Sequence, residues 1–180
     1  FTPEELRRIG DICLANDVLV VADEVHHDLI QKEYSHTVYA NIGEKYAQNC
    51  VVCTSLSKTF NLAGLCFASI IIPNAELRAR FQKTMATHGF KHTSRFGPVA
   101  HEAAYRRGGE WLDELLEVVK GNYEYFKDFM AQHFPKVVVT QLEGTYLAWF
   151  NCKSFGMTDT QLKDFLTDEC FLYLDNGVEF

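Results

Sequence analysis

An acid and a lysine follow two apolar runs of this sequence, near the points where those runs end. Asp23 comes directly after the run Asp17 to Ala22, and Lys58 comes shortly after the run Asn49 to Thr54. Both runs are short and rich in valine, which is typical of strands buried on both faces of a sheet. Because ligands of open α/β sheets collect beyond the carboxyl ends of the strands, we expect Asp23 and Lys58 to face one crevice.

A lysine amine and a carboxylate in one crevice are the groups that pyridoxal-phosphate chemistry requires. The deprotonated amine of Lys58 can condense with the aldehyde of the cofactor and later act as a proton shuttle. A carboxylate such as Asp23 keeps the pyridine nitrogen protonated, so that the ring withdraws electrons from the substrate. The hydroxyls of Ser55 and Ser57, with the N–H groups of their turn, can bind the phosphate. Each residue alone would be a cap or a solvated side chain, so the prediction depends on the combination.

The remaining sequence predicts alternating helices and strands. Thr2-Pro3-Glu4-Glu5 combines an N-cap, a proline at the first helical position and acidic residues in the first turn, and we expect a helix from there to about Asn16. The other expected elements are a short helix or loop over 39–48, strands over 65–72, 136–140, 145–150 and 171–174, and helices over 73–88, 94–107, 109–134 and 158–170.

This order predicts an α/β fold with a mainly parallel sheet, followed by an α+β segment. We expect residues 1–115 to form part of a cofactor-binding large domain. Residues 116–180 would form a connecting helix and the start of a smaller domain.

Composition narrows the classes of partner. The 180 residues include 17 basic and 24 acidic side chains, which give a net charge of −7. An acidic chain without a long basic run argues against a nucleic-acid partner. No apolar stretch approaches the roughly 20 residues that a membrane helix needs, and the first residues read as a polar helix start instead of a signal peptide. We therefore expect a cytoplasmic protein without a membrane partner.

The six cysteines predict no metal site. Cys50 and Cys53 have the C-x-x-C spacing of metal and redox motifs, but residues three apart on a strand point to opposite faces. We expect reduced thiols in a reducing compartment.

Two segments resemble the cofactor signatures of fold-type-I pyridoxal-phosphate enzymes, which share the aspartate-aminotransferase fold. These segments are Asp23-Glu24-Val25-His26 and Ser55-Leu56-Ser57-Lys58-Thr59-Phe60-Asn61-Leu62-Ala63-Gly64-Leu65, and 35 residues separate Asp23 from Lys58. The segment Glu143 to Trp149 resembles the small-domain strand of the same family. The resemblance covers nearly the whole chain and is greatest to the MalY/PatB-type cystathionine β-lyases, which are C–S lyases within the class I and II aminotransferases.

The resemblance implies a role for each matching residue. Lys58 would hold the cofactor as a Schiff base and Asp23 would pair with the pyridinium nitrogen. His26 stands where many aminotransferases have a tyrosine that hydrogen-bonds the ring hydroxyl, and the C–S lyases often have histidine there. Ser55 and Ser57 would hold the phosphate. The neighbouring His27 receives no role.

Cys66 is an informative departure from the aminotransferase pattern. Many aminotransferases continue the lysine motif as Gly-Leu-Arg, whose arginine clamps the phosphate, whereas this chain has Gly64-Leu65-Cys66. The departure favours β-elimination of sulfur amino acids such as cystathionine or cysteine, which yields pyruvate, ammonia and a thiol. The alternatives are an aminotransferase, which would need a 2-oxo acid, and a pyridoxal-phosphate-fold regulatory or interaction module without turnover.

The resemblance also implies features that this sequence does not contain. The family grips the substrate carboxylate with a C-terminal arginine, and no arginine follows Arg107. Its ring-stacking aromatic residue and Gly-rich phosphate loop would lie upstream of Phe1. We therefore expect an internal fragment that is inactive alone and binds pyridoxal phosphate weakly or not at all, from a parent enzyme that is a homodimer.

Overall fold

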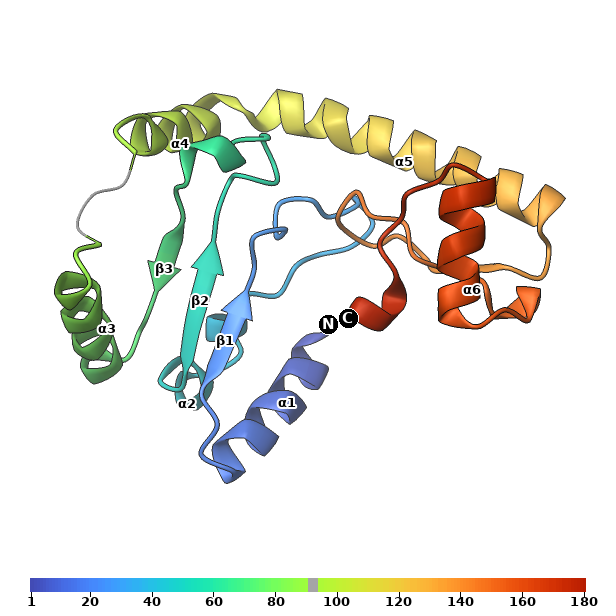
Figure 1. Ribbon diagram of the computed structural model, residues 1–180. Helices are drawn as coiled ribbons and strands as arrows, with labels where there is room; N and C mark the ends of the chain where they lie inside the picture. Colours follow the sequence, from blue (N-terminus) through green and yellow to red (C-terminus); the bar gives the residue numbers. More distant parts are fainter. Residues whose placement is uncertain (91–93) are drawn as a thin grey trace. The chain divides into compact units, whose positions relative to one another are not determined.

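The computed structural model describes residues 1–90 and 94–180 of the chain, in which helices and short strands alternate (Figure 1). The helices are α1 (Pro3–Ala15), α2 (Glu44–Ala47), α3 (Ala75–Thr87), α4 (Phe96–Arg107), α5 (Gly109–His133) and α6 (Asp159–Asp164). The strands are β1 (Val20–Asp23), β2 (Cys50–Thr54), β3 (Ser69–Ile71), β4 (Val138–Val139) and β5 (Phe150–Asn151). The predicted α/β class is thereby confirmed.

The chain packs as two compact units. The first contains residues 1–121 and 142–146, and the second contains residues 122–141 and 147–180. This division concerns packing alone, and the predicted domain boundary after residue 115 stays a prediction.

Helix α1 begins as its sequence predicts. The Thr2 hydroxyl accepts a hydrogen bond from the Glu5 N–H at 3.2 Å, and the Glu5 carboxylate accepts one from the Thr2 N–H at 2.7 Å. This capping box satisfies N–H groups that have no partner inside the helix.

The sheet of the first unit has the order β1-β2-β3 (Figure 1). Strands β1 and β2 are parallel, with Asp23 opposite Cys53, whereas β3 pairs antiparallel with β2. Because two parallel strands end at the same edge, the segments that follow β1 and β2 leave the sheet side by side. The two predicted site segments are these two segments.

One face of this sheet carries the core of the first unit. Cys50 is fully buried and Val52 is 1% exposed, and both pack against a cluster of aromatic and aliphatic side chains from the connection between β1 and β2. The cluster comprises Tyr39, Ile42 and Tyr46, with Leu6 and Leu14 of α1 packed against it. Burial of this apolar surface holds the strands that position the site.

The prediction that β1 is buried on both faces is wrong. Val21 is 62% exposed, and all three residues of β3 are exposed as well. The core cluster covers only the opposite face of β1, through Val20 and Ala22. A run of valines indicates that a strand can be buried. Whether a face is buried depends on whether another part of the structure packs against it.

The predicted strand 65–72 is shorter than expected. Residues Ala63–Leu65 form a 3₁₀ turn, and Cys66 adopts the left-handed conformation with φ 49°. A strand cannot continue through that conformation, so pairing with β2 begins only at Ser69.

The second unit is built around the end of α5. Strand β4 pairs antiparallel with β5, the rings of Phe126 and Phe150 lie 5.4 Å apart, and the Tyr123 hydroxyl donates to the Thr140 carbonyl at 3.0 Å. Helix α6 starts at a second capping box, formed by Thr158, and continues as a π-helical turn to Glu169.

Two strand predictions near the second unit are wrong. The strand expected over 145–150 is limited to Phe150–Asn151, and Thr145, where the strand was expected to begin, has φ 63°, which an extended backbone does not adopt. The segment 171–174 is not a strand, and Phe171 has φ 56°. Among the described residues, none of the helices combines the length and the apolar character needed to cross a membrane.

The contact between α1 and α2 leads to a stability prediction. A Cβ on Gly10 would lie 2.5 Å from the Tyr46 ring and 2.7 Å from the Tyr39 hydroxyl. We expect Gly10→Ala to lower the free energy of unfolding by about 1–3 kcal/mol, because the core must move to admit the methyl group. Urea unfolding measures the change.

Gly121 in α5 is the matched control. Apart from its chain neighbours and the nearby backbone of its own helix, no described atom lies within 4 Å of a Cβ built there. Gly121→Ala should therefore stabilise the protein by about 0.5–1 kcal/mol through helix propensity. Equal effects of the two substitutions would contradict the packing described for Gly10.

Candidate functional site

The position of Asp23 is set by the sheet. It is the last residue of β1, and the next residue, Glu24, donates its N–H to the Cys53 carbonyl at 2.8 Å. The exposed carboxylate accepts a hydrogen bond from the Val25 N–H at 3.3 Å, which turns the chain away from the strand direction. Asp23 therefore presents a solvated anionic group at the edge of the sheet.

Lys58 lies beyond the sheet, four residues after Thr54, the last residue of β2. Its turn is closed by hydrogen bonds from the Phe60 N–H to the Leu56 carbonyl at 2.9 Å and from the Leu62 N–H to the Ser57 carbonyl at 3.0 Å. The Lys58 side chain is exposed, although both of its neighbours are at least partly buried. The turn thus projects the amine from between two residues that are at least partly buried.

His26 shares its surroundings with both of these groups. Burial lowers the pKa of its imidazole, the charge of Lys58 lowers it further, and the charge of Asp23 acts in the opposite direction. The ring makes an edge contact with Tyr146, with centroids 5.7 Å apart. Among the described residues, its buried Nδ1 atom has no hydrogen-bond partner. A buried polar atom without a partner is unusual and marks a place where a ligand can bind.

Ser55 and Ser57 lie together, as predicted, but their hydroxyls are not equivalent. The buried Ser55 Oγ donates to the Phe67 carbonyl at 2.8 Å and accepts from the Ser57 N–H at 3.1 Å. It also lies 2.5 Å from the Ser57 Oγ. A hydroxyl has one proton. Because Ser55 donates its proton to the Phe67 carbonyl, Ser57 must be the donor in the contact between the two hydroxyls. The Ser57 proton is the one that can turn to another acceptor.

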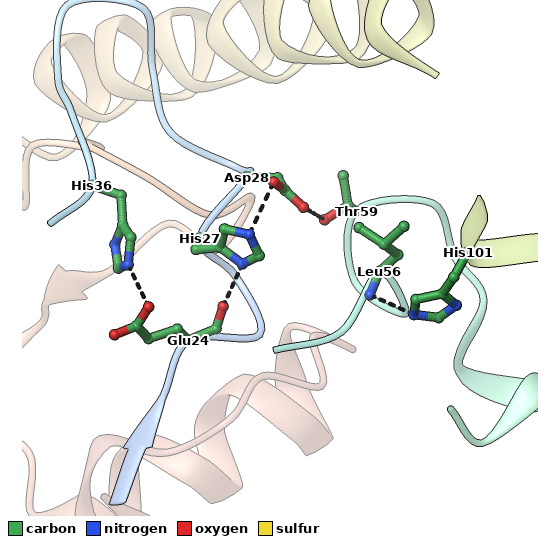
Figure 2. Close-up of polar contacts among 7 residues, drawn as sticks. All are labelled: Glu24, His27, Asp28, His36, Leu56, Thr59 and His101. Carbon is green, nitrogen blue, oxygen red and sulfur yellow. Dashed lines mark hydrogen bonds and ion pairs between the residues drawn. The ribbon is translucent and has the colours of Figure 1, made fainter. Parts of the chain in front are cut away.

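His101 is a residue of this region that the sequence reasoning missed. It is 5% exposed on α4, and its Nε2 accepts a hydrogen bond from the Leu56 N–H at 3.2 Å (Figure 2). Its Nδ1 lies 3.2 Å from the Gly97 carbonyl, and its ring contacts Phe67 with centroids 4.4 Å apart. This pattern requires a neutral ring that is protonated on Nδ1. His101 thereby anchors the main chain two residues before Lys58.

Glu24 has a structural role that the sequence reasoning did not assign to it. Its carboxylate is buried and accepts a hydrogen bond from the Tyr39 N–H at 2.8 Å. It accepts another from His36 Nε2 at 3.0 Å (Figure 2). A buried carboxylate is tolerated only with such partners. Glu24 thereby links the loop after β1 to Tyr39, the first residue of the aromatic and aliphatic core cluster.

The assembled groups have the chemistry of a cofactor site. The end of β1 and the two segments that follow β1 and β2 supply an amine, a carboxylate, a hydroxyl that can redirect its proton, and an imidazole atom with no partner among the described residues. These groups fit pyridoxal phosphate, which carries an aldehyde, a ring nitrogen, a ring hydroxyl and a phosphate. The arrangement offers one group of suitable type for each of them.

Comparison with known proteins identifies relatives of the chain. The family model described as aminotransferase class I and II matches residues 1–180. Cystathionine beta-lyase PatB of Bacillus subtilis is 34% identical over 98% of this chain, and protein MalY of Escherichia coli is 31% identical over 94% of it. The crystal structure of cystalysin from Treponema denticola, which contains a pyridoxal 5'-phosphate cofactor, superimposes with a TM-score of 0.92 over 97% of this chain, at 34% identity.

The match does not extend over the whole length of these relatives. This chain spans 46% of PatB, 43% of MalY and 44% of the cystalysin chain.

The environment of His26 predicts a dependence of stability on pH. The pKa of this ring in the folded protein lies below its ordinary value of 6.5, so below that pH the unfolded chain binds more protons than the folded one. The free energy of unfolding therefore decreases as the pH falls through this range, by less than about 1.4 kcal/mol per pH unit from this one group. Urea unfolding of the wild type and of His26→Asn at several pH values measures the contribution. The variant should have the shallower slope, and an equal slope would contradict the burial of this ring beside a cation.

Proposed function

We propose that this chain, which belongs to the aminotransferase class I and II family, forms the lysine-bearing part of a pyridoxal-phosphate-dependent C–S β-lyase. The substrates would be sulfur amino acids such as cystathionine or cysteine, and the products would be pyruvate, ammonia and a thiol. The observation that carries the proposal is the buried His26 Nδ1 atom, which has no described partner and whose ring feels the charges of both Asp23 and Lys58. The similarity to cystathionine beta-lyase PatB supports the choice of reaction.

Each side chain would have a separate task. Lys58 Nζ would attach the cofactor, remove the proton from the substrate Cα and return protons during the reaction. Asp23 would hold a proton on the pyridine nitrogen, and His26 Nδ1 would hydrogen-bond the ring hydroxyl. When bound, pyridoxal phosphate supplies the electron sink that stabilises the pair left at Cα. The Cβ–S bond would then break, and the sulfur would leave as a thiolate that takes up a proton. Hydrolysis of the released aminoacrylate by water would give pyruvate and ammonia.

The phosphate would be held by the turn before Lys58. Ser57 would turn its hydroxyl proton from Ser55 to a phosphate oxygen. Ser55, bonded to the Phe67 carbonyl, would still hold the Ser57 main chain by accepting its N–H. The neighbouring Cys66 is exposed and cannot supply the positive charge that an arginine would bring. This difference supports the lyase over the aminotransferase.

The assembly and location follow as parts of the same proposal. We propose a cytoplasmic homodimer with an amino-acid substrate and without nucleic-acid or membrane partners, in which residues 1–115 belong to the large domain. The net charge of −7 supports the exclusion of nucleic acid. On α4, Phe96 and Val99 are 75% and 67% exposed, which supports an assembly in which another protein surface covers them.

The proposal predicts the fate of cystathionine. The whole protein, loaded with pyridoxal phosphate, should release both pyruvate and a thiol. Lys58→Ala should lower that rate on the order of 10²–10⁴-fold, since the group that moves the Cα proton is lost. Coupled assays for pyruvate and for free thiol measure the reaction.

Lys45→Ala is the matched control, because Lys45 is an exposed lysine that pairs with Asp11 on the surface. It should leave the rate unchanged. Transfer of the amino group to a 2-oxo acid without release of thiol would replace the lyase by an aminotransferase. Bound cofactor without either reaction would favour the non-catalytic module.

A further inference from the structure

Lys58 needs anchors that the sheet does not supply. Asp23 belongs to β1 and is fixed by strand pairing, whereas Lys58 follows β2 by four residues. On one side of the lysine, Leu56 is held by His101. On the other side, Thr59 is 1% exposed, and the Thr59 Oγ1 donates to the Asp28 Oδ2 at 3.0 Å. These two contacts hold the turn two residues before and one residue after the lysine.

The Asp28 carboxylate is itself held in place. Its second oxygen, Oδ1, lies 3.2 Å from His27 Nε2, and His27 Nδ1 lies 2.7 Å from the Glu24 carbonyl (Figure 2). Both ring nitrogens of His27 therefore face acceptors, and the ring donates to both only when it is doubly protonated. The contacts run in sequence from the Glu24 main chain through His27 and Asp28 to Thr59.

This series of contacts joins the two loops of the site. Asp28 lies in the loop that follows Asp23, and Thr59 is the residue after Lys58. The Asp28–Thr59 hydrogen bond therefore links the segment that carries the carboxylate to the segment that carries the amine. Its donor is almost fully buried, so loss of the bond would leave a polar group without a partner or release the turn.

We propose that Asp28 is a positioning residue for Lys58, which acts through the Thr59 hydroxyl and is itself oriented by His27. The proposal rests on the proposed function, since Lys58 matters as the cofactor lysine. It assigns a task to His27 and Asp28, for which the sequence provided none. Asp28 does not contact the reacting atoms in this role. Its effect is to fix the position of the Lys58 amine relative to the Asp23 carboxylate.

Two substitutions of Thr59 separate the hydroxyl from the shape of the side chain. Thr59→Val keeps the volume and removes the donor, whereas Thr59→Ser keeps the donor. In the whole protein without cofactor, Thr59→Val and Asp28→Ala should each accelerate amide hydrogen exchange over residues 56–62 roughly ten-fold, in line with the loss of one hydrogen bond to a charged group. Thr59→Ser should exchange like the wild type.

The second readout follows the cofactor. After addition of pyridoxal phosphate, growth of the visible absorbance band reports the rate at which Lys58 becomes linked to it. Thr59→Val and Asp28→Ala should slow this rate roughly ten-fold, at a temperature where both variants are folded. The double variant should be no slower than the slower single variant, because both changes remove the same contact. A change in global stability alone would not slow the rate under these conditions.

Asp11→Asn is the matched control, because Asp11 forms a surface ion pair with Lys45 away from the turn. It should change neither readout. Wild-type exchange and wild-type linkage in both Thr59→Val and Asp28→Ala would overturn the proposal, and so would a double variant that is roughly a hundred-fold slower, since the two residues would then act independently. If Thr59→Val does not fold, Asp28→Ala alone decides by the same criteria. If the wild type forms no visible band, the proposed function fails, and the exchange measurement still decides whether Asp28 holds the turn.

Discussion

The parallel register of β1 and β2 is the constraint on which the site depends. It places Asp23 opposite Cys53, so that the chain leaves both strands at one edge of the sheet. Burial of Cys50 and Val52 against the aromatic cluster holds that register, because a shift by one residue would turn these side chains to the exposed face. The carboxylate is thus positioned by the sheet, while the lysine must be positioned by its turn.

The turn of Lys58 is held by polar contacts instead of apolar packing alone. His101 accepts the Leu56 N–H and the Phe67 carbonyl accepts the Ser55 hydroxyl. These acceptors come from α4 and from the segment before β3, so the turn is tied to distant parts of the chain. An exposed amine on a fixed main chain can reach a ligand without a large loss of conformational entropy in the backbone. Burial lowers the pKa of His26, and the Nδ1 atom of its ring has no hydrogen-bond partner within the described part of the chain.

The sequence predicted the parts of this site that depend on local patterns. Valine-rich runs located β1 and β2, and the residues after them located Asp23, Lys58 and the serine pair. The resemblance supplied roles for these residues and for His26. It could not reveal that His101 meets Leu56 across 45 residues of sequence, since no periodicity encodes such a contact. The exposure of Val21 and the brevity of β3 were missed for a similar reason, because burial depends on which surfaces meet after folding.

The central claim is that Lys58, among all the lysines of the chain, is the one that attaches pyridoxal phosphate. Incubation of the whole protein with the cofactor, reduction with borohydride and peptide mass mapping would locate the adduct directly. The account predicts that the added mass lies on the peptide that carries Lys58. An adduct on an exposed lysine such as Lys45, with Lys58 unlabelled, would contradict it.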